Sequence, residues 1–124
     1  MPPTRPGPPG PEEEGPWEAL RAAALALPGA SFGPERALAI ARLTSKTPSL
    51  RARHIEKHLQ WQAFLVPIMR KRMGLEGNES DPSPRAIVAA ALSCLDTATE
   101  IWAERGGKGN LAEIYDQAVT AIRR

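Results

Sequence analysis

The stretch from Pro48 to Met73 constrains the fold more than any other part of this sequence. Its apolar residues recur at the three-to-four spacing of two helical stripes. One stripe consists of Leu50, Ile55, Leu59, Gln62, Val66, Met69 and Met73, and the other of Trp61, Phe64, Leu65 and Ile68. Because a surface helix needs only one apolar face, we expect a central helix that other helices cover or that lines a pocket. Pro67 in its interior removes a backbone hydrogen bond and predicts a kink.

Four other segments have apolar residues at helical spacing, and none alternates as a strand does. Together with the central helix over 48–73, they predict helices over residues 16–27, 34–45, 84–105 and 110–122. Thr47, Ser83 and Asn110 are the expected N-terminal caps, and Gly74 and Gly106 mark helix ends. The predicted fold class is all-α, a five-helix bundle.

The length of 124 residues allows one domain. We expect residues 17–124 to form it, because residues 1–16 are almost entirely Pro, Gly and Glu, as in a disordered tail. A net charge of +2 is too small to indicate nucleic-acid binding by itself. No stretch approaches the roughly 20 continuous apolar residues of a membrane helix, and the N-terminus does not resemble a secretory signal. With Cys94 as the only cysteine, we predict a cytoplasmic protein without membrane contact.

The sequence offers few groups for catalysis or metal binding. His54 and His58 are four residues apart, as on a zinc-binding helix, but no third ligand is evident, so solvated or pocket-rim histidines are favoured. Cys94 has apolar neighbours, the setting of an inert thiol. Residues 106–109 are glycine-rich but follow no strand, so they do not predict a phosphate loop. We therefore predict no enzyme, no catalytic residue, no metal and no cofactor.

Two residue sets permit more than one interpretation. The aromatic residues Trp17, Phe32, Trp61, Phe64 and Trp102 could form the core or could line an apolar small-molecule pocket. The basic residues between Arg42 and Lys57 could contact DNA directly, but a solvated face is favoured because no recognition helix accompanies them.

The last two predicted helices carry more apolar surface than one thin layer behind them can cover. Alanines at positions 86, 89, 90 and 98 would also let a partner helix approach closely. Such an excess of apolar surface favours dimerisation.

Several segments together resemble a known family. They are PWEALRAAA from residue 16, ALAIARLTSKTPSLRAR from residue 37, KRMG from residue 71 and SPRAIVAAALSCLDTATEIWAERGGKGNLAEIYDQAV from residue 83. Between about residues 17 and 122 the chain is similar to the C-terminal regulatory domain of TetR-family transcriptional regulators, in particular the mycofactocin-regulator subgroup. The most telling pieces are Leu43 with Thr47 to Arg51, and Trp102 with Gly106-Gly107.

The resemblance implies a homodimeric effector-binding and dimerisation domain that takes a small apolar or amphipathic effector inside the bundle. The expected ligand-binding residues are Trp17, Leu20, Leu38, His58, Trp61, Phe64, Leu65, Ile68, Leu95 and Trp102. The expected dimer-interface residues are Val88, Leu92, Leu95, Thr99, Leu111, Ile114, Tyr115, Ala118 and Ile122. The family's helix-turn-helix domain has no counterpart in this sequence, so we expect DNA contact only through an N-terminal domain absent from this chain. The alternative is a stand-alone helical protein–protein interaction module that modulates a full-length regulator.

Overall fold

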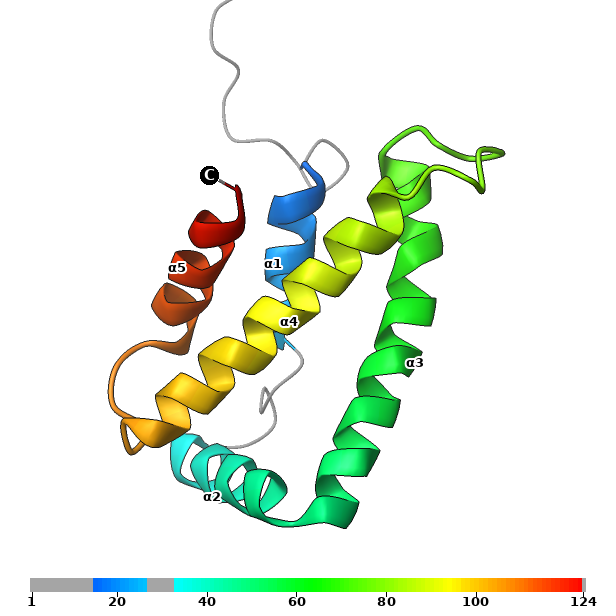
Figure 1. The fold of residues 1–124 in the computed structure, drawn as a ribbon. Helices are drawn as coiled ribbons and strands as arrows, with labels where there is room; N and C mark the ends of the chain where they lie inside the picture. Colours follow the sequence, from blue (N-terminus) through cyan, green and yellow to red (C-terminus); the bar gives the residue numbers. More distant parts are fainter. Residues whose placement is uncertain (1–14, 27–32, 124) are drawn as a thin grey trace, which may run out of the picture.

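The structure is a computed structural model that describes residues 15–26 and 33–123. This part of the chain is all-α, as predicted (Figure 1). Its helices are α1 (Pro16–Ala26), α2 (Pro34–Lys46), α3 (Pro48–Arg72), α4 (Ser83–Glu104) and α5 (Leu111–Arg123). The predicted bounds agree with these to within one residue at each end. Most of the predicted tail, and Phe32, lie outside the described residues.

Helix α4 is the central element of the bundle. It crosses the domain diagonally and packs against each of the other four helices (Figure 1). Its buried face consists of Pro84, Val88, Ala91, Leu92, Cys94, Leu95, Ala98 and Trp102. The small residues Ala91 and Ala98 are fully buried, so neighbouring helices can approach α4 closely. The prediction that the helix over 48–73 is central is therefore wrong, because α3 packs mainly against α2 and α4.

Helix α4 is also long and apolar enough to cross a membrane, by length and composition alone. A helix that forms the core of a bundle passes the same test. The contacts of α4 with the four other helices account for its composition without a membrane.

Helix α3 is covered along only one side. Its buried residues are Leu65, Met69 and Arg70, all in its second half. The exposed large apolar residues of α3 are Ile55 and Leu59 on one flank and Phe64 and Ile68 on the other. The first of the two expectations for this helix, that other helices cover both apolar stripes, is wrong for the described chain, because α4 covers mainly the strip between them. The helix runs without interruption through Pro67.

Side chains near the helix starts show which caps form. Asn110 is confirmed as a cap, because its Oδ1 accepts a hydrogen bond from the Ala112 N–H at 2.8 Å. At α4 the prediction that Ser83 is the capping residue is wrong. Asp81 Oδ1 accepts a hydrogen bond from the Ser83 N–H at 2.8 Å, so Asp81 supplies the capping side chain. Thr47 does occupy the N-cap position of α3, but its side chain makes no capping hydrogen bond.

Candidate functional site

An apolar seam joins α1, α3 and α4. Its buried residues are Leu20, Leu65, Met69, Val88, Ala91 and Leu92, with Trp17 and Trp61 packed against them. The rings of Trp61 and Phe64 meet edge to face, with centroids 6.0 Å apart and planes at 86°, a favourable aromatic geometry. Phe64 is 61% exposed, and the exposed Ile68 lies one helical turn further along α3. We call Trp61, Phe64 and Ile68 the aromatic flank of α3. This flank connects the buried seam to the protein surface.

A second apolar cluster lies where α1, α2, α4 and α5 meet. Its buried residues are Ala24, Cys94, Leu95, Ala98, Trp102, Ile114 and Tyr115, and Leu38 packs against them. Gly107 permits this packing, since its φ is +77° and a Cβ there would lie 3.1 Å from Leu38 Cδ2 and 3.4 Å from Trp102 Cζ2. A side chain at position 107 would therefore require the Leu38 side chain to move by a few tenths of an ångström and would be strained by the positive φ.

Tyr115 places a polar atom inside this second cluster. The residue is only 1% exposed, and its hydroxyl is buried without a hydrogen-bond partner among the described residues. The pKa of Tyr115 is raised to about 12, chiefly by burial and to a smaller extent by the nearby Cys94 and Asp116. Because a buried unpaired hydroxyl costs about 1–3 kcal/mol, a ligand or water that paired with it would be stabilised here.

The predicted ligand-binding residues lie in three places. Trp17, Leu20, Trp61, Phe64, Leu65 and Ile68 lie along the seam or its aromatic flank. Leu38, Leu95 and Trp102 belong to the second cluster. His58 instead contacts Asp96 of α4. The structure therefore brings together most of the predicted residues between α1 and α3, and separates the others from them.

Most of the predicted dimer-interface residues face the interior of the single chain. Val88, Leu92, Leu95, Ile114 and Tyr115 are buried. Thr99, Leu111 and Ala118 are half-buried, and Ile122 is exposed. A partner could reach the buried residues only if α4 and α5 separated from their neighbours.

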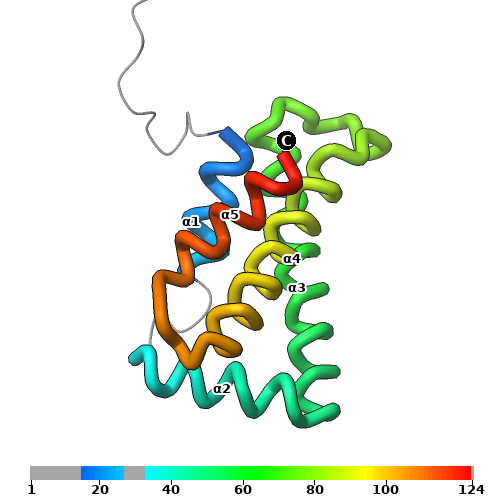
Figure 2. Tube along the Cα trace, turned by 60° about the vertical axis from the view of Figure 1, so that its left-hand side comes forward, coloured from blue at the N-terminus to red at the C-terminus, as the bar shows by residue number. Residues whose placement is uncertain are grey.

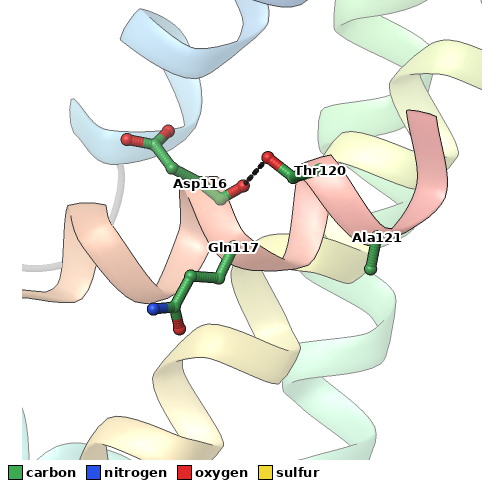
Figure 3. A pocket seen from close by; sticks show the side chains of 4 residues that line it. All are labelled: Asp116, Gln117, Thr120 and Ala121. Atoms are coloured by element: carbon green, nitrogen blue, oxygen red, sulfur yellow. Dashed lines mark hydrogen bonds between the residues drawn. The ribbon is translucent and has the colours of Figure 1, made fainter. Parts of the chain in front are cut away.

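The outward faces of α4 and α5 carry small and polar side chains. Ser93 and Thr97 are exposed on α4, and Thr120 and Ala121 on α5. Asp116, Gln117, Thr120 and Ala121 line a shallow hollow of about 360 Å³ (Figure 3). In this hollow the Thr120 hydroxyl donates to the Asp116 carbonyl at 2.8 Å. The longer Glu100 and Glu104 are also exposed on α4.

The comparison with protein families bears on this arrangement. A family model described as the MftR C-terminal domain, of the TetR type, matches residues 14–124. The chain belongs to this family of TetR-type C-terminal domains. The resemblance predicted from the sequence is thereby confirmed. Comparisons with curated proteins and with solved structures found no match.

Membership fixes the general role of this TetR-type domain. It belongs to the part of a transcription regulator that serves ligand binding and dimerisation in general. Domains of this family are typically non-enzymatic, and regulators of the TetR family are soluble cytoplasmic proteins. Cys94 fits such a role, since burial raises the pKa of its thiol and makes it less reactive.

A wider hollow of about 770 Å³ opens on the other flank of α3 in the TetR-type domain. It is lined by Leu59, Gln62, Ala63, Val66, Pro67, Arg70, Glu76, Gly77, Glu79 and Arg85. Pro67 cannot donate a hydrogen bond to the Ala63 carbonyl, so the hollow contains an acceptor freed from the helix. The sequence did not predict this hollow because Glu76, Gly77 and Glu79 of its wall belong to the polar loop after α3, whose position depends on the tertiary structure.

The buried Arg70 holds that loop in place. Its Nη1 donates to the Asn78 carbonyl at 2.6 Å and to the Asp81 carbonyl at 3.4 Å. Asp81 in turn accepts hydrogen bonds from Ser83, which together with the charge of Arg70 lower the pKa of its carboxyl. The guanidinium therefore stabilises the loop that connects α3 to α4.

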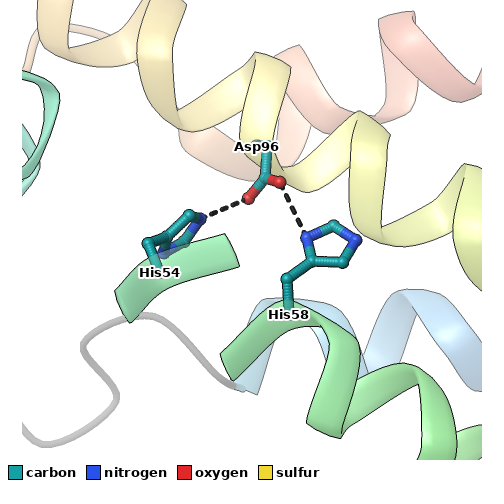
Figure 4. A group of neighbouring side chains, drawn as sticks. All are labelled: His54, His58 and Asp96. Atoms are coloured by element: carbon teal, nitrogen blue, oxygen red, sulfur yellow. Dashed lines mark hydrogen bonds and ion pairs between the residues drawn. The ribbon is translucent and has the colours of Figure 1, made fainter. Parts of the chain in front are cut away.

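His54, His58 and Asp96 form a cluster that bridges α3 and α4 (Figure 4). His54 Nε2 lies 2.9 Å from Asp96 Oδ1, and His58 Nδ1 lies 2.8 Å from Asp96 Oδ2. The structure thus places beside the histidine pair a third possible ligand, Asp96, that was not evident in the sequence. Asp96 is 42 residues from His54, so only the packing of α3 on α4 could reveal it.

Proposed function

We propose that this TetR-type domain binds a small apolar or amphipathic effector at the seam between α1 and α3. The observation that carries the proposal is the aromatic flank, where Phe64 stays 61% exposed beside Trp61. A large exposed aromatic side chain continuous with a buried seam is typical of a binding surface rather than of a finished core. Leu20 and Leu65 are buried below it, so an effector that displaced α1 would contact them with its apolar part.

Helix α1 connects this seam to α5. Trp17 and Leu20 belong to the seam, while Arg21 Nε lies 2.8 Å from Asp116 Oδ1 of α5. The Arg123 guanidinium also lies 5.3 Å from the centre of the Trp17 ring, and Figure 2 shows α1 beside α5. An effector that displaced α1 would thus shift α5. We propose this as the route by which binding changes the dimer.

We further propose that the domain dimerises through the outward faces of α4 and α5. Small residues support this interface, because the distance between the axes of packed helices, about 8–10 Å, depends on the side chains at the contact, and short side chains allow the closest approach. Ser93 and Thr97 of α4 and Ala121 of α5 meet that requirement. The proposed interface therefore lies on the same two helices as the predicted one. It consists of their outer faces and the exposed Ile122.

Binding to the aromatic flank is tested with Phe64→Ala, and Ile55→Ala on the opposite flank is the matched control, since both residues are similarly exposed. The probes are saturated and aromatic carboxylates of increasing size, with affinity followed by tryptophan fluorescence. Burying a phenylalanine side chain contributes about 1.5–3 kcal/mol, so we expect Phe64→Ala to weaken binding by at least about tenfold and Ile55→Ala by less than about twofold. Equal effects of the two variants, or no saturable binding of any probe, would contradict the proposed effector site.

Dimerisation is tested by sedimentation equilibrium. We expect the wild type to be a dimer and Ser93→Arg to be a monomer, because a buried arginine without a partner is strongly unfavourable. Gln60→Arg is the control, since Gln60 is exposed in the middle of α3. A monomeric wild type would refute the homodimer, and a dimeric Ser93→Arg would place the interface elsewhere.

A stand-alone interaction module is the second candidate function. The exposed Ile40 and Leu43 of α2 favour it, together with Ile55 and Leu59 of α3. This candidate predicts a complex with a full-length TetR-type regulator that Leu43→Arg abolishes and Phe64→Ala leaves intact. The opposite pattern would favour the effector site.

A further inference from the structure

We infer that His54, His58 and Asp96 form a binding site for a divalent transition-metal ion, with Zn²⁺ as the best fit. The bound ion would link α3 to α4. Two imidazole nitrogens and one carboxylate oxygen are a ligand set that Zn²⁺ takes in proteins, usually with a water at the fourth position. The inference is independent of the proposed effector site, because neither the aromatic flank nor the outward face of α5 contributes a ligand.

The geometry of the cluster suits a small ion. The ligand atoms of the three residues all lie within 4.8 Å of one another. With ligand bonds of about 2.0–2.1 Å, tetrahedral Zn²⁺ needs its ligand atoms about 3.3 Å apart. The present contacts of His58 and His54, at 2.8 and 2.9 Å, go to different oxygens of Asp96. To bind one ion, these contacts would have to open by about half an ångström and the carboxylate would have to turn one oxygen toward both rings. Figure 4 shows both rings directed at the same carboxylate from one helix face.

The surroundings provide an entry path and a free coordination position. The side chain of His54 is 53% exposed and that of Asp96 33%, while His58 is 15% exposed. Solvent can therefore reach the carboxylate and supply the remaining ligand. Cys94 is buried in the second cluster and is not part of the site. Arg51 and Lys57 are nearby cations on α3, but both are exposed, so solvent screens their repulsion of an ion.

The position of the cluster gives the ion a structural effect. Residues 51–57 of α3 are exposed, and the buried residues of this helix all belong to its second half. The first half of α3 is thus joined to the middle of α4 by the polar contacts of His54 and His58 with Asp96. An exposed His–Asp pair contributes little by itself, whereas a shared ion would hold the two helices at a fixed distance.

The test uses the tag-free full chain, stripped with a chelator and titrated with Zn²⁺ by calorimetry. We expect saturable binding of one ion per chain. Loss of a group that merely orients a ligand already costs about 10–100-fold in metal affinity, so His54→Gln, His58→Gln and Asp96→Asn should each weaken binding by at least about tenfold. Glu104→Gln, which removes an exposed carboxylate from the same helix, and Cys94→Ala should change the affinity by less than about twofold.

Co²⁺ gives a second readout that does not depend on stability. We expect the intense visible absorption of four-coordinate Co²⁺ without a thiolate charge-transfer band, and its loss in His54→Gln, whose exposed side chain can be replaced without disturbing the core. No saturable binding at millimolar Zn²⁺ would overturn the inference. Binding that persists unchanged in Asp96→Asn and both histidine variants would also overturn it, since the ion would then bind elsewhere on the surface.

Discussion

Replacing Tyr115 by phenylalanine should make this protein more stable, although most substitutions of buried residues destabilise. The hydroxyl is buried and has no partner among the described residues, so the folded chain has given up its bond to water without gaining another. Removing such a group relieves about 1–3 kcal/mol. The void left by one oxygen atom offsets part of this gain. We expect a net increase of about 1 kcal/mol in the free energy of unfolding, or about 4 °C in the melting temperature.

The same hydroxyl predicts how stability depends on pH. The pKa of Tyr115 is about 12 in the folded chain and near 10 when unfolded. Between these values the unfolded chain binds fewer protons than the folded chain, so stability falls as the pH rises. At about 1.4 kcal/mol per unit, the loss in the wild type approaches at most about 2.7 kcal/mol by pH 12. Tyr115→Phe should lack this part of the alkaline destabilisation.

Tyr115 is the only tyrosine in the chain, which makes the assay direct. Tyrosinate absorbance should titrate near pH 12 in the folded protein and near pH 10 in denaturant, while urea unfolding of wild type and Tyr115→Phe gives the stability difference. A Tyr115→Phe variant destabilised by more than about 1 kcal/mol would show that the hydroxyl has a hydrogen-bond partner. A folded-state titration near pH 10 would show that the hydroxyl is solvated. Either result would refute the reasoning.

Two further predictions concern packing and the loop after α3. In urea unfolding, Gly107→Ala should destabilise the fold by about 1–3 kcal/mol more than the control Gly109→Ala. Both residues have positive φ, but an added Cβ meets Leu38 only at position 107. Equal losses of stability would mean that the Leu38 side chain moves aside without cost. Arg70→Met should lower the free energy of unfolding by about 2 kcal/mol, because it removes the charged hydrogen bonds to the loop, including the one to the Asn78 carbonyl. The variant should also be cleaved faster in this loop by limited proteolysis. An unchanged cleavage rate would show that the loop does not depend on Arg70.

Local signals in the sequence were sufficient for the helices. Proline at the first position of α2 and α3, glycine after α3 and α4, and Asn110 before α5 act within a few residues of one another. Such signals do not depend on the tertiary structure, and for this reason the predicted bounds fall within one residue of those observed.

The order of packing could not be predicted in the same way. Helix α3 is longer and richer in aromatic residues, but α4 is central because Ala91 and Ala98 let other helices approach it. Apolar periodicity identifies a face and does not say which element covers it. The contact of Asp96 with His54 had no local signal either, since it depends on how α3 lies against α4.

The exposed apolar residues of α3 support the proposed effector surface. The two apolar stripes exist as predicted, but within the described chain the bundle leaves Ile55 and Leu59 exposed on one flank and Phe64 and Ile68 on the other. The part of these apolar side chains that stays exposed to water contributes nothing to the folding of the single chain, whereas covering it on binding contributes about 25 cal/mol per Å². In locally consistent sequences such departures concentrate at functional sites. The aromatic flank lies next to the buried seam and is linked through α1 to α5, which supports our proposal that an effector binding there acts on the rest of the domain.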